Sequence, residues 1–242
     1  AVVFKTQEEL LEQLDGLANG KPHLDTSLAT VGDAPGLAVS FVFSGHGGQW
    51  PGMQRELMEQ VATFRGKMSQ CEAAVQAYAN WSVLDAFGKA DAVPAGGIGD
   101  LEIVHACLFA FQVSLAAAVE FFGITPTAVT GHSMGEVAAA HVAGALSLED
   151  AVRVIVERSR ALKRALETIE DHGAMAALRI SADEAERLIR DRGGRLTVSV
   201  SNSPKYTVLA GPRALLEEII RDLRKRKLGG RIMDVPGAAH TP

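Results

Sequence analysis

The sequence is poor in cysteine, in aromatic residues and in positive charge. Only two cysteines occur among 242 residues, Cys71 and Cys107, and both lie in apolar stretches of helical character. They predict neither a disulfide framework nor a cysteine-based metal site, and we expect no bound metal. The net charge is −5 and aromatic residues make up 5% of the chain, without interleaving among the basic ones. This composition argues against nucleic acid as a partner.

No stretch of the sequence resembles a signal peptide, and none is an uninterrupted membrane span. It opens on AVVFKTQEELLEQL, which is charged and amphipathic rather than apolar. The longest apolar stretch, residues 103–122, is interrupted by His105, Gln112 and Glu120, and predicts a buried core helix. We therefore expect a cytoplasmic protein without a membrane partner. With 47% hydrophobic residues, the chain is long enough for one large domain and a smaller one.

What the sequence does have is a Gly-x-Ser-x-Gly motif, GHSMG at residues 131–135. A short extended stretch at 126–130 precedes it, and the Ala-rich stretch EVAAAHVAGAL follows it. Strand, tight turn and helix in that order are the context of a nucleophile elbow, in which the serine hydroxyl stands clear of the sheet. The glycines remove side chains that would crowd the turn. The motif predicts that Ser133 is a nucleophile, whereas the alternative is a plain glycine-rich turn.

The remaining pattern predicts an α/β fold in two parts. The apolar run 37–44 (LAVSFVFS) is typical of a buried parallel strand, and it ends in the glycine-rich turn 45–48. Ser147 to Asp150 has the spacing of a capping box for a helix that reaches about residue 167. From Gly173 onward, the order β-α-β-β-α-β predicts an inserted ferredoxin-like unit. The large part, with its parallel sheet and elbow, is expected to be α/β-hydrolase-like.

A nucleophilic serine needs a base, and the sequence has seven histidines. His132 and His141 flank the elbow, and two others lie in a linker and a polar loop, at positions 23 and 172. The remaining candidates are His46, His105 and His240. His240 follows the inserted unit, where the chain returns to the large part, and this topology favours it as the base.

Two further groups complete the candidate site. The backbone N–H of Met134, directly after the serine, is the obvious donor to an oxyanion, and the N–H of His46 in the glycine-rich turn is a candidate for the second. Arg158 borders the apolar face of the helix at 148–167. Such an arginine is either paired structurally or directed at an anion, and a guanidinium in a pocket can bind a carboxylate through two hydrogen bonds.

Positive charge is concentrated late in the chain. Residues 171–242 carry 13 Lys and Arg against nine Asp and Glu, and the stretch RDLRKRK at 221–227 is the densest part. This stretch is either a solvated helix face or a docking patch for an acidic partner.

Several motifs in order resemble the acyltransferase domains of modular and iterative polyketide synthases, and are similar to malonyl-CoA:acyl-carrier-protein transacylases. They are FVFSGHGGQWPGM, GHSMGEVAAAHVAGALSLEDAV, ERS, NSP and DVPGAAH, from about Leu37 to the end. The Gly-His-Gly-Gly turn is a hint of the iterative 6-methylsalicylic type. The resemblance implies four segments: the end of a ketosynthase–acyltransferase linker at 1–36, the large subdomain at 37–170, the ferredoxin-like subdomain at 171–236, and a return to the large subdomain at 237–242. The family continues for some tens of residues beyond this point.

The resemblance also implies residue roles. Ser133 matches the nucleophile, His240 the general base of a Ser–His dyad, and Arg158 the arginine that binds the free carboxylate of the extender unit. Met134 and His46 match the oxyanion-hole positions. His105, Gly237, Ala238 and Ala239 match the positions that line the substrate pocket. The chain departs from the family where His46 and His105 replace common glutamines, and where Gly237-Ala238-Ala239-His240 replaces the usual specificity tetrads.

The implied activity is that of an acyl-CoA:acyl-carrier-protein S-acyltransferase with malonyl-CoA as substrate. The acceptor is the phosphopantetheine thiol of a carrier protein, and no cofactor is expected to be permanently bound. The expected partners are this carrier protein, the adjacent ketosynthase and the other domains of the same synthase. Methylmalonyl is the second candidate, because the small Ala239 does not exclude an α-methyl group. Two other classes stay open: an α/β-hydrolase esterase, for which Asp171 or Asp234 would supply the acid, and a non-catalytic docking fragment.

Overall fold

The computed structural model describes residues 2–27, 38–89, 100–168, 172–233, 235 and 237–241. The chain divides into two compact units, Ala1–Ala38 and Val39–Pro242. In the first unit, helix α1 (Gln7–Ala18) begins at a capping box, in which the Thr6 side chain accepts from the Glu9 N–H and the Glu9 side chain accepts from the Thr6 N–H. An antiparallel bridge joins Val2 to Thr26, and the buried Gln13 side chain bonds to both ends of this loop.

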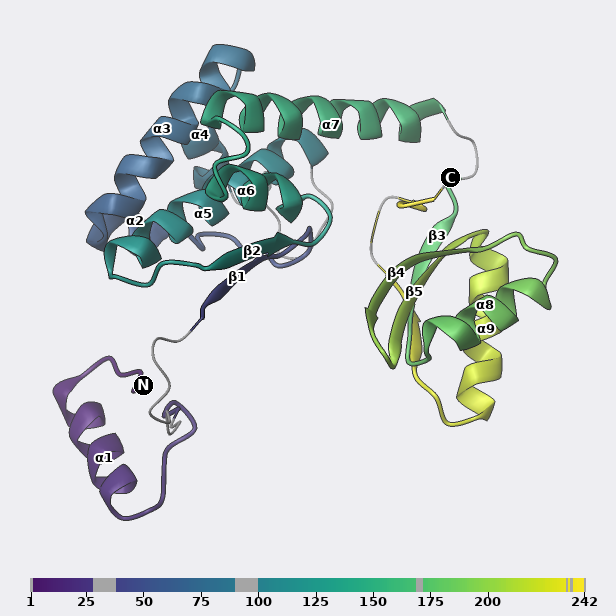
Figure 1. The fold of residues 1–242 in the computed structure, drawn as a ribbon, viewed down its shortest axis with the longest axis horizontal. Coiled ribbons are helices and arrows are strands. Elements are labelled where there is room, and N and C mark those ends of the chain that lie inside the picture. The colour runs from purple at the N-terminus through teal and green to yellow at the C-terminus, as the bar shows by residue number, and fades with distance from the viewer. Residues whose placement is uncertain are drawn as a thin grey trace. The chain divides into compact units, whose positions relative to one another are not determined.

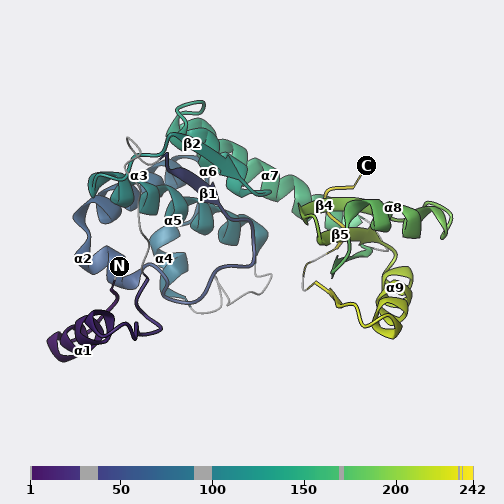
Figure 2. The ribbon, with the colours of Figure 1, turned by 60° about the horizontal axis from the view of Figure 1, so that its bottom comes forward.

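The first part of the second unit is built on two parallel strands. Strands β1 (Ser40–Phe43) and β2 (Ala128–Gly131) pair in parallel and lie side by side in both views (Figure 1, Figure 2). Between them come α2 (Arg55–Gln60), α3 (Ala62–Tyr78), α4 (Val83–Gly88) and α5 (Leu101–Phe121). After β2 come α6 (Gly135–Val142) and α7 (Leu148–Thr168). Ser147 caps α7, since its hydroxyl accepts from the Asp150 N–H at 3.0 Å, as its spacing predicts.

Helix α5 forms the centre of this part. It packs against α3, α4, α6 and α7, and buries an almost continuous run from Val104 to Ala110. By length and composition alone α5 could cross a membrane, but 67% of its apolar window is buried inside the structure. The prediction of a buried core helix is confirmed.

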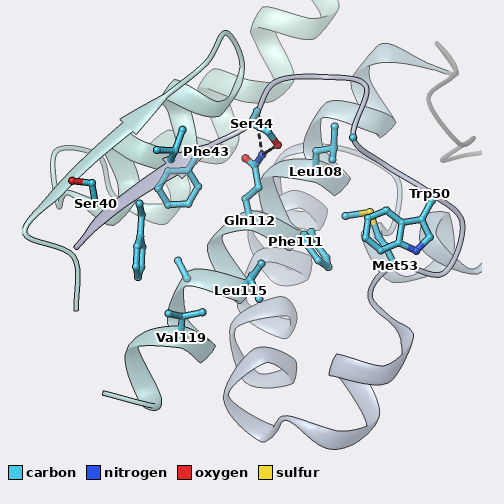
Figure 3. Close-up of a pocket in the computed structure, with 14 residues that line it drawn as sticks. Ser40, Phe43, Ser44, Trp50, Met53, Leu108, Phe111, Gln112, Leu115 and Val119 are labelled. Atoms are coloured by element: carbon cyan, nitrogen blue, oxygen red, sulfur yellow. Dashed lines mark hydrogen bonds between the residues drawn. The ribbon is translucent and has the colours of Figure 1, made fainter. Parts of the chain in front are cut away.

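Strand β1 differs from its prediction. Its parallel pairing is as expected, but it is not buried on both faces: the Val42 side chain is 72% exposed. A groove of about 400 Å³ runs between β1 and α5, and Trp50 and Leu115 on its walls are also exposed (Figure 3). The sequence pattern predicted full burial because a run with six apolar residues in eight is typical of a sheet covered by helices on both faces.

The second part, from residue 172, has the element order β3 (Ala174–Leu178), α8 (Ala182–Arg190), β4 (Thr197–Ser203), β5 (Tyr206–Gly211), α9 (Arg213–Lys225) and β6 (Gly230–Ile232). The four strands form one antiparallel sheet in the order β4-β5-β3-β6. The α/β fold class is therefore confirmed, and the β-α-β-β-α-β order is the one that the sequence predicts.

The two faces of this sheet have different partners. Ala174, Ala176 and Leu178 of β3 pack with apolar residues of α8 and α9, which lie together on one side of the sheet (Figure 1). The alternate residue Met175 faces the other way, with Val208 and Ala210 of β5. Residues 238 and 239, both alanine, pack against this second face. Because side chains alternate along a strand, one sheet has a helix-covered face and a face that is available to line a pocket.

Candidate active site

Ser133 lies in the turn between β2 and α6, in a left-handed backbone conformation (φ 54°). Such a conformation costs a non-glycine residue about 1–3 kcal/mol and persists only when its surroundings fix it. The two glycines that flank Ser133 show how the surrounding backbone fixes this conformation. A Cβ on Gly131 would overlap the Glu136 backbone nitrogen, and one on Gly135 would overlap the Phe43 carbonyl oxygen. The Gly-x-Ser-x-Gly pattern is thus a packing requirement of this turn.

His240 lies opposite the serine. Its Nε2 is 3.0 Å from Ser133 Oγ, across 107 positions in sequence. Backbone contacts fix this segment, because the Ala238 N–H donates to the His172 carbonyl at 2.7 Å. A Cβ at Gly237 would come within 2.7 Å of the same carbonyl, so glycine permits the close approach. An imidazole at hydrogen-bond distance from a serine hydroxyl is the geometry of a general base with its nucleophile.

Arg158 approaches the serine from α7. Its Nη2 is 3.4 Å from Ser133 Oγ, whereas its Nη1 is buried and has no hydrogen-bond partner among the described residues. Arg160, two positions on, differs: it forms ion pairs with Glu102 at 2.9 Å and Glu157 at 3.0 Å. A buried donor on a charged group is costly to leave unpaired. Arg160 is therefore the structurally paired arginine of this helix, and Arg158 has a donor available for an anion.

The glycine-rich turn after β1 packs onto the elbow. A Cβ at Gly45 would lie 2.9 Å from His132 Nδ1 and 3.1 Å from its carbonyl oxygen, so the two backbones approach closely. Gln112 of α5 holds the start of this turn: its amide donates to the Ser44 carbonyl at 2.7 Å and to Ser44 Oγ at 3.2 Å (Figure 3). Sequence reasoning did not assign Gln112 a role, because a single polar residue on an apolar helix does not show which loop it faces.

His105 and His46 meet beside this turn. Their rings are in edge-to-face contact, with centroids 5.4 Å apart. The His105 side chain is buried, and its Nδ1 is 2.8 Å from Ser159 Oγ. Burial, together with the nearby His46 and Arg158, lowers the pKa of His105 to about 4. His105 is therefore neutral at pH 7.

This lowered pKa predicts a stability that depends on pH. The folded state favours neutral His105, whereas an unfolded histidine titrates near 6.5. The contribution is fully present above pH 6.5 and is lost as the pH falls toward 4, by up to about 3 kcal/mol of unfolding free energy. Urea unfolding of the wild type and of His105→Gln at pH 7 and at pH 4.5 measures it. We expect a smaller pH-dependent loss in the variant, and equal losses would contradict the assignment.

One pocket of about 150 Å³ brings most of the predicted residues together. His46, His105, Ser133, Arg158 and residues 237–240 all line it. Met134 does not line it: its side chain is buried at the start of α6, so only its backbone can serve the site. The pocket has further walls that the sequence did not single out, mainly apolar ones from the second sheet face and from α7: Leu101, His132, Leu162, Leu166, Met175, Val200, Asn202, Val208, Met233 and Val235.

No cluster of three or more metal-ligating side chains occurs within the described stretches of the chain. The two aspartates considered as a third acid, Asp171 and Asp234, lie outside the described residues.

The chain belongs to the acyl transferase domain family, whose model matches residues 40–242. The resemblance to polyketide synthase acyltransferases is thereby confirmed. Erythronolide synthase EryA2 from Saccharopolyspora erythraea is 38% identical over 242 residues, which cover 100% of this chain and 7% of that protein. The acyltransferase domain from module 8 of the salinomycin polyketide synthase is 33% identical with a TM-score of 0.83, and the match covers 100% of this chain and 55% of that one.

A third relative was solved with a ligand. The acyltransferase domain of SpnD, in complex with 2-(pent-4-yn-1-yl)malonyl, is 25% identical with a TM-score of 0.73. The match covers 93% of this chain and 50% of that one. This chain thus spans a small part of the curated synthase it matches and about half of these two solved domains.

Proposed function

We propose that this chain transfers a malonyl-type acyl group from acyl-CoA to the phosphopantetheine thiol of an acyl carrier protein, through an acyl-Ser133 intermediate. The observation that carries this proposal is the buried Nη1 of Arg158, which has no partner among the described residues in a pocket shared with Ser133 and His240. A thioester carbonyl is only a neutral acceptor, whereas an acyl group that ends in a carboxylate offers this cation two charge-assisted hydrogen bonds.

The proposed mechanism has two half-reactions. In the first, His240 Nε2 takes the proton from Ser133 Oγ as the oxygen attacks the thioester carbonyl, and the same proton passes to the departing CoA sulfur. In the second, the phosphopantetheine thiol gives its proton to His240 and attacks the acyl-serine, and the proton returns to Ser133. Each tetrahedral oxyanion is held by the N–H groups of Met134 and His46, near the N-terminus of α6.

The proposed first substrate is malonyl, with methylmalonyl as the alternative. Both carry the carboxylate that Arg158 can bind, whereas acetyl does not. The half-buried Ala238 and Ala239 lie against an apolar wall, which supports an acyl group with a small α-substituent. The malonyl-type ligand in the SpnD domain supports the same acyl class. We further propose that the first part of the second unit is the hydrolase-like subdomain with the elbow, and that the second sheet with α8 and α9 is the ferredoxin-like subdomain. The proposed segments are the linker at 1–36, the large subdomain at 37–170, the ferredoxin-like subdomain at 171–236 and the return to the large subdomain at 237–242.

The proposed partners are the carrier protein, the ketosynthase and the other domains of a cytoplasmic synthase. The helix α9 is a candidate docking surface for an acidic carrier, but part of its charge is already neutralised. Arg226 pairs with Glu184, and Asp222 pairs with both Arg192 and Lys225. These pairs support the solvated-face alternative for this part of the helix.

The rival activity, ester hydrolysis, is separated from transfer by the fate of the acyl group. The full-length protein is incubated with malonyl-CoA and a phosphopantetheine-bearing carrier protein, and both malonyl-carrier and free malonate are measured. We expect the malonyl-carrier to form faster than malonate, because a transferase must hold its acyl-serine until the thiol arrives. Malonate release that outpaces carrier loading would support the esterase, and neither product would support a docking fragment.

A further inference from the structure

The acyl pocket contains a buried histidine that can accept a hydrogen bond, in addition to the buried donor of Arg158. The acceptor is His105, which is 4% exposed and lines the pocket with Ser133 and Arg158. Its chemistry follows from the neighbouring serine. Ser159 Oγ lies 2.8 Å from His105 Nδ1 and 2.7 Å from the Ile155 carbonyl oxygen.

These two distances fix the tautomer of His105. A serine hydroxyl has one proton, and the carbonyl oxygen of Ile155 can only accept it. Ser159 therefore donates to Ile155 and accepts from His105, which must carry its proton on Nδ1. The opposite tautomer would leave two oxygens 2.7 Å apart with no proton between them. His105 Nε2 consequently carries a lone pair that can accept a hydrogen bond.

A malonyl carboxylate cannot satisfy both groups. Its oxygens only accept, so they suit the donors of Arg158 but would face the lone pair of His105 unfavourably. A methyl branch offers no donor. A hydroxyl on the carbon between the two carbonyl groups occupies about the same space as a methyl group and does supply a donor. An amine there would carry positive charge beside Arg158, which disfavours it.

We propose that His105 is a specificity-determining residue whose Nε2 accepts a hydrogen bond from an α-hydroxyl group, so that the site prefers a hydroxymalonyl unit to a methylmalonyl unit. This inference rests on the proposed function and names a substrate class within it. The low pKa of His105, about 4, keeps the acceptor unprotonated at neutral pH. The contacts to Ser159 and to the His46 ring hold the imidazole in place.

The test is a competition on the full-length protein between hydroxymalonyl and methylmalonyl thioesters of pantetheine. Intact-mass spectrometry measures the ratio of the two adducts. We expect at least about a tenfold preference for hydroxymalonyl, because only the hydroxyl can donate a hydrogen bond to His105 in the pocket. His105→Phe should bring the ratio to about one, since the ring remains without its acceptor. Ser159→Ala should lower the ratio while keeping the imidazole, because the tautomer is no longer fixed.

The outcomes separate the two proposals. If neither thioester nor malonyl-CoA acylates the wild type, the proposed function fails and this inference fails with it. If malonyl-CoA acylates the wild type but the ratio is one or below, only the role of His105 is overturned. A preference that persists unchanged in His105→Phe also overturns it. The ratio of hydroxymalonyl to methylmalonyl adducts on the wild-type protein tests the role of His105 even if a variant does not fold.

Discussion

In the variant His240→Ala, acylation of Ser133 by malonyl-CoA is expected to slow by about 10²–10⁴-fold. The reason is the 3.0 Å contact between His240 Nε2 and Ser133 Oγ, which lets the imidazole remove the proton during attack. Without a base, the hydroxyl must attack while it still holds its proton, and general-base catalysis of this kind contributes a factor in that range. Rapid-quench mass spectrometry of the acyl-enzyme measures the rate.

The matched control is His23→Ala. His23 is an exposed histidine of the first unit, whose ring accepts from the Asp25 N–H. It should leave the rate unchanged. A rate in His240→Ala within about threefold of the wild type would mean that another group takes the proton.

Replacing Arg158 by alanine is expected to change which acyl groups the protein accepts. Malonyl loading should fall by about 30-fold or more, because a buried charge-assisted pair is worth about 2–5 kcal/mol when one partner is removed. Acetyl loading should stay the same or rise, since an acetyl group has no carboxylate for Arg158. The measurement is the ratio of malonyl to acetyl adducts after incubation with equal amounts of both CoA esters.

Arg160→Ala is the control for this second variant. It removes an arginine from the same helix, but one that is engaged with Glu102 and Glu157. It should reduce stability and leave the acyl ratio as it is in the wild type. If Arg158→Ala kept the wild-type ratio, or if Arg160→Ala changed it equally, the proposed role of Arg158 would be wrong.

Local chemistry explains why much of the candidate site could be predicted. Gly131 and Gly135 are needed for steric reasons that act within a few residues of Ser133, so a short motif carries the information. The capping of α7 by Ser147 is equally local. The pairing of His240 with Ser133 spans 107 positions, and topology only favoured His240 among three candidates. The family resemblance, rather than the residue pattern, singled it out.

The features that escaped prediction depend on contacts between distant elements. The sequence singled out Arg158 but did not show whether it is paired, and the surroundings of Arg158 and Arg160 answer that question. The tautomer of His105 depends on Ser159, 54 residues away. The exposure of Val42 was not predicted. A run of apolar residues indicates that a strand tends to be buried, but it does not show whether another segment of the chain packs over it.

In the proposed function, one acyl group passes through Ser133 on its way to a carrier thiol. The most direct test is a single-turnover chase of the full-length protein with malonyl-CoA, followed by peptide mapping with mass spectrometry before and after a phosphopantetheine-bearing carrier protein is added. We expect one malonyl group on the peptide that contains Ser133, its disappearance as the carrier gains the same mass, and no adduct in Ser133→Ala. A carrier that is loaded equally well by Ser133→Ala, or a malonyl group on another residue that moves to the carrier, would contradict it.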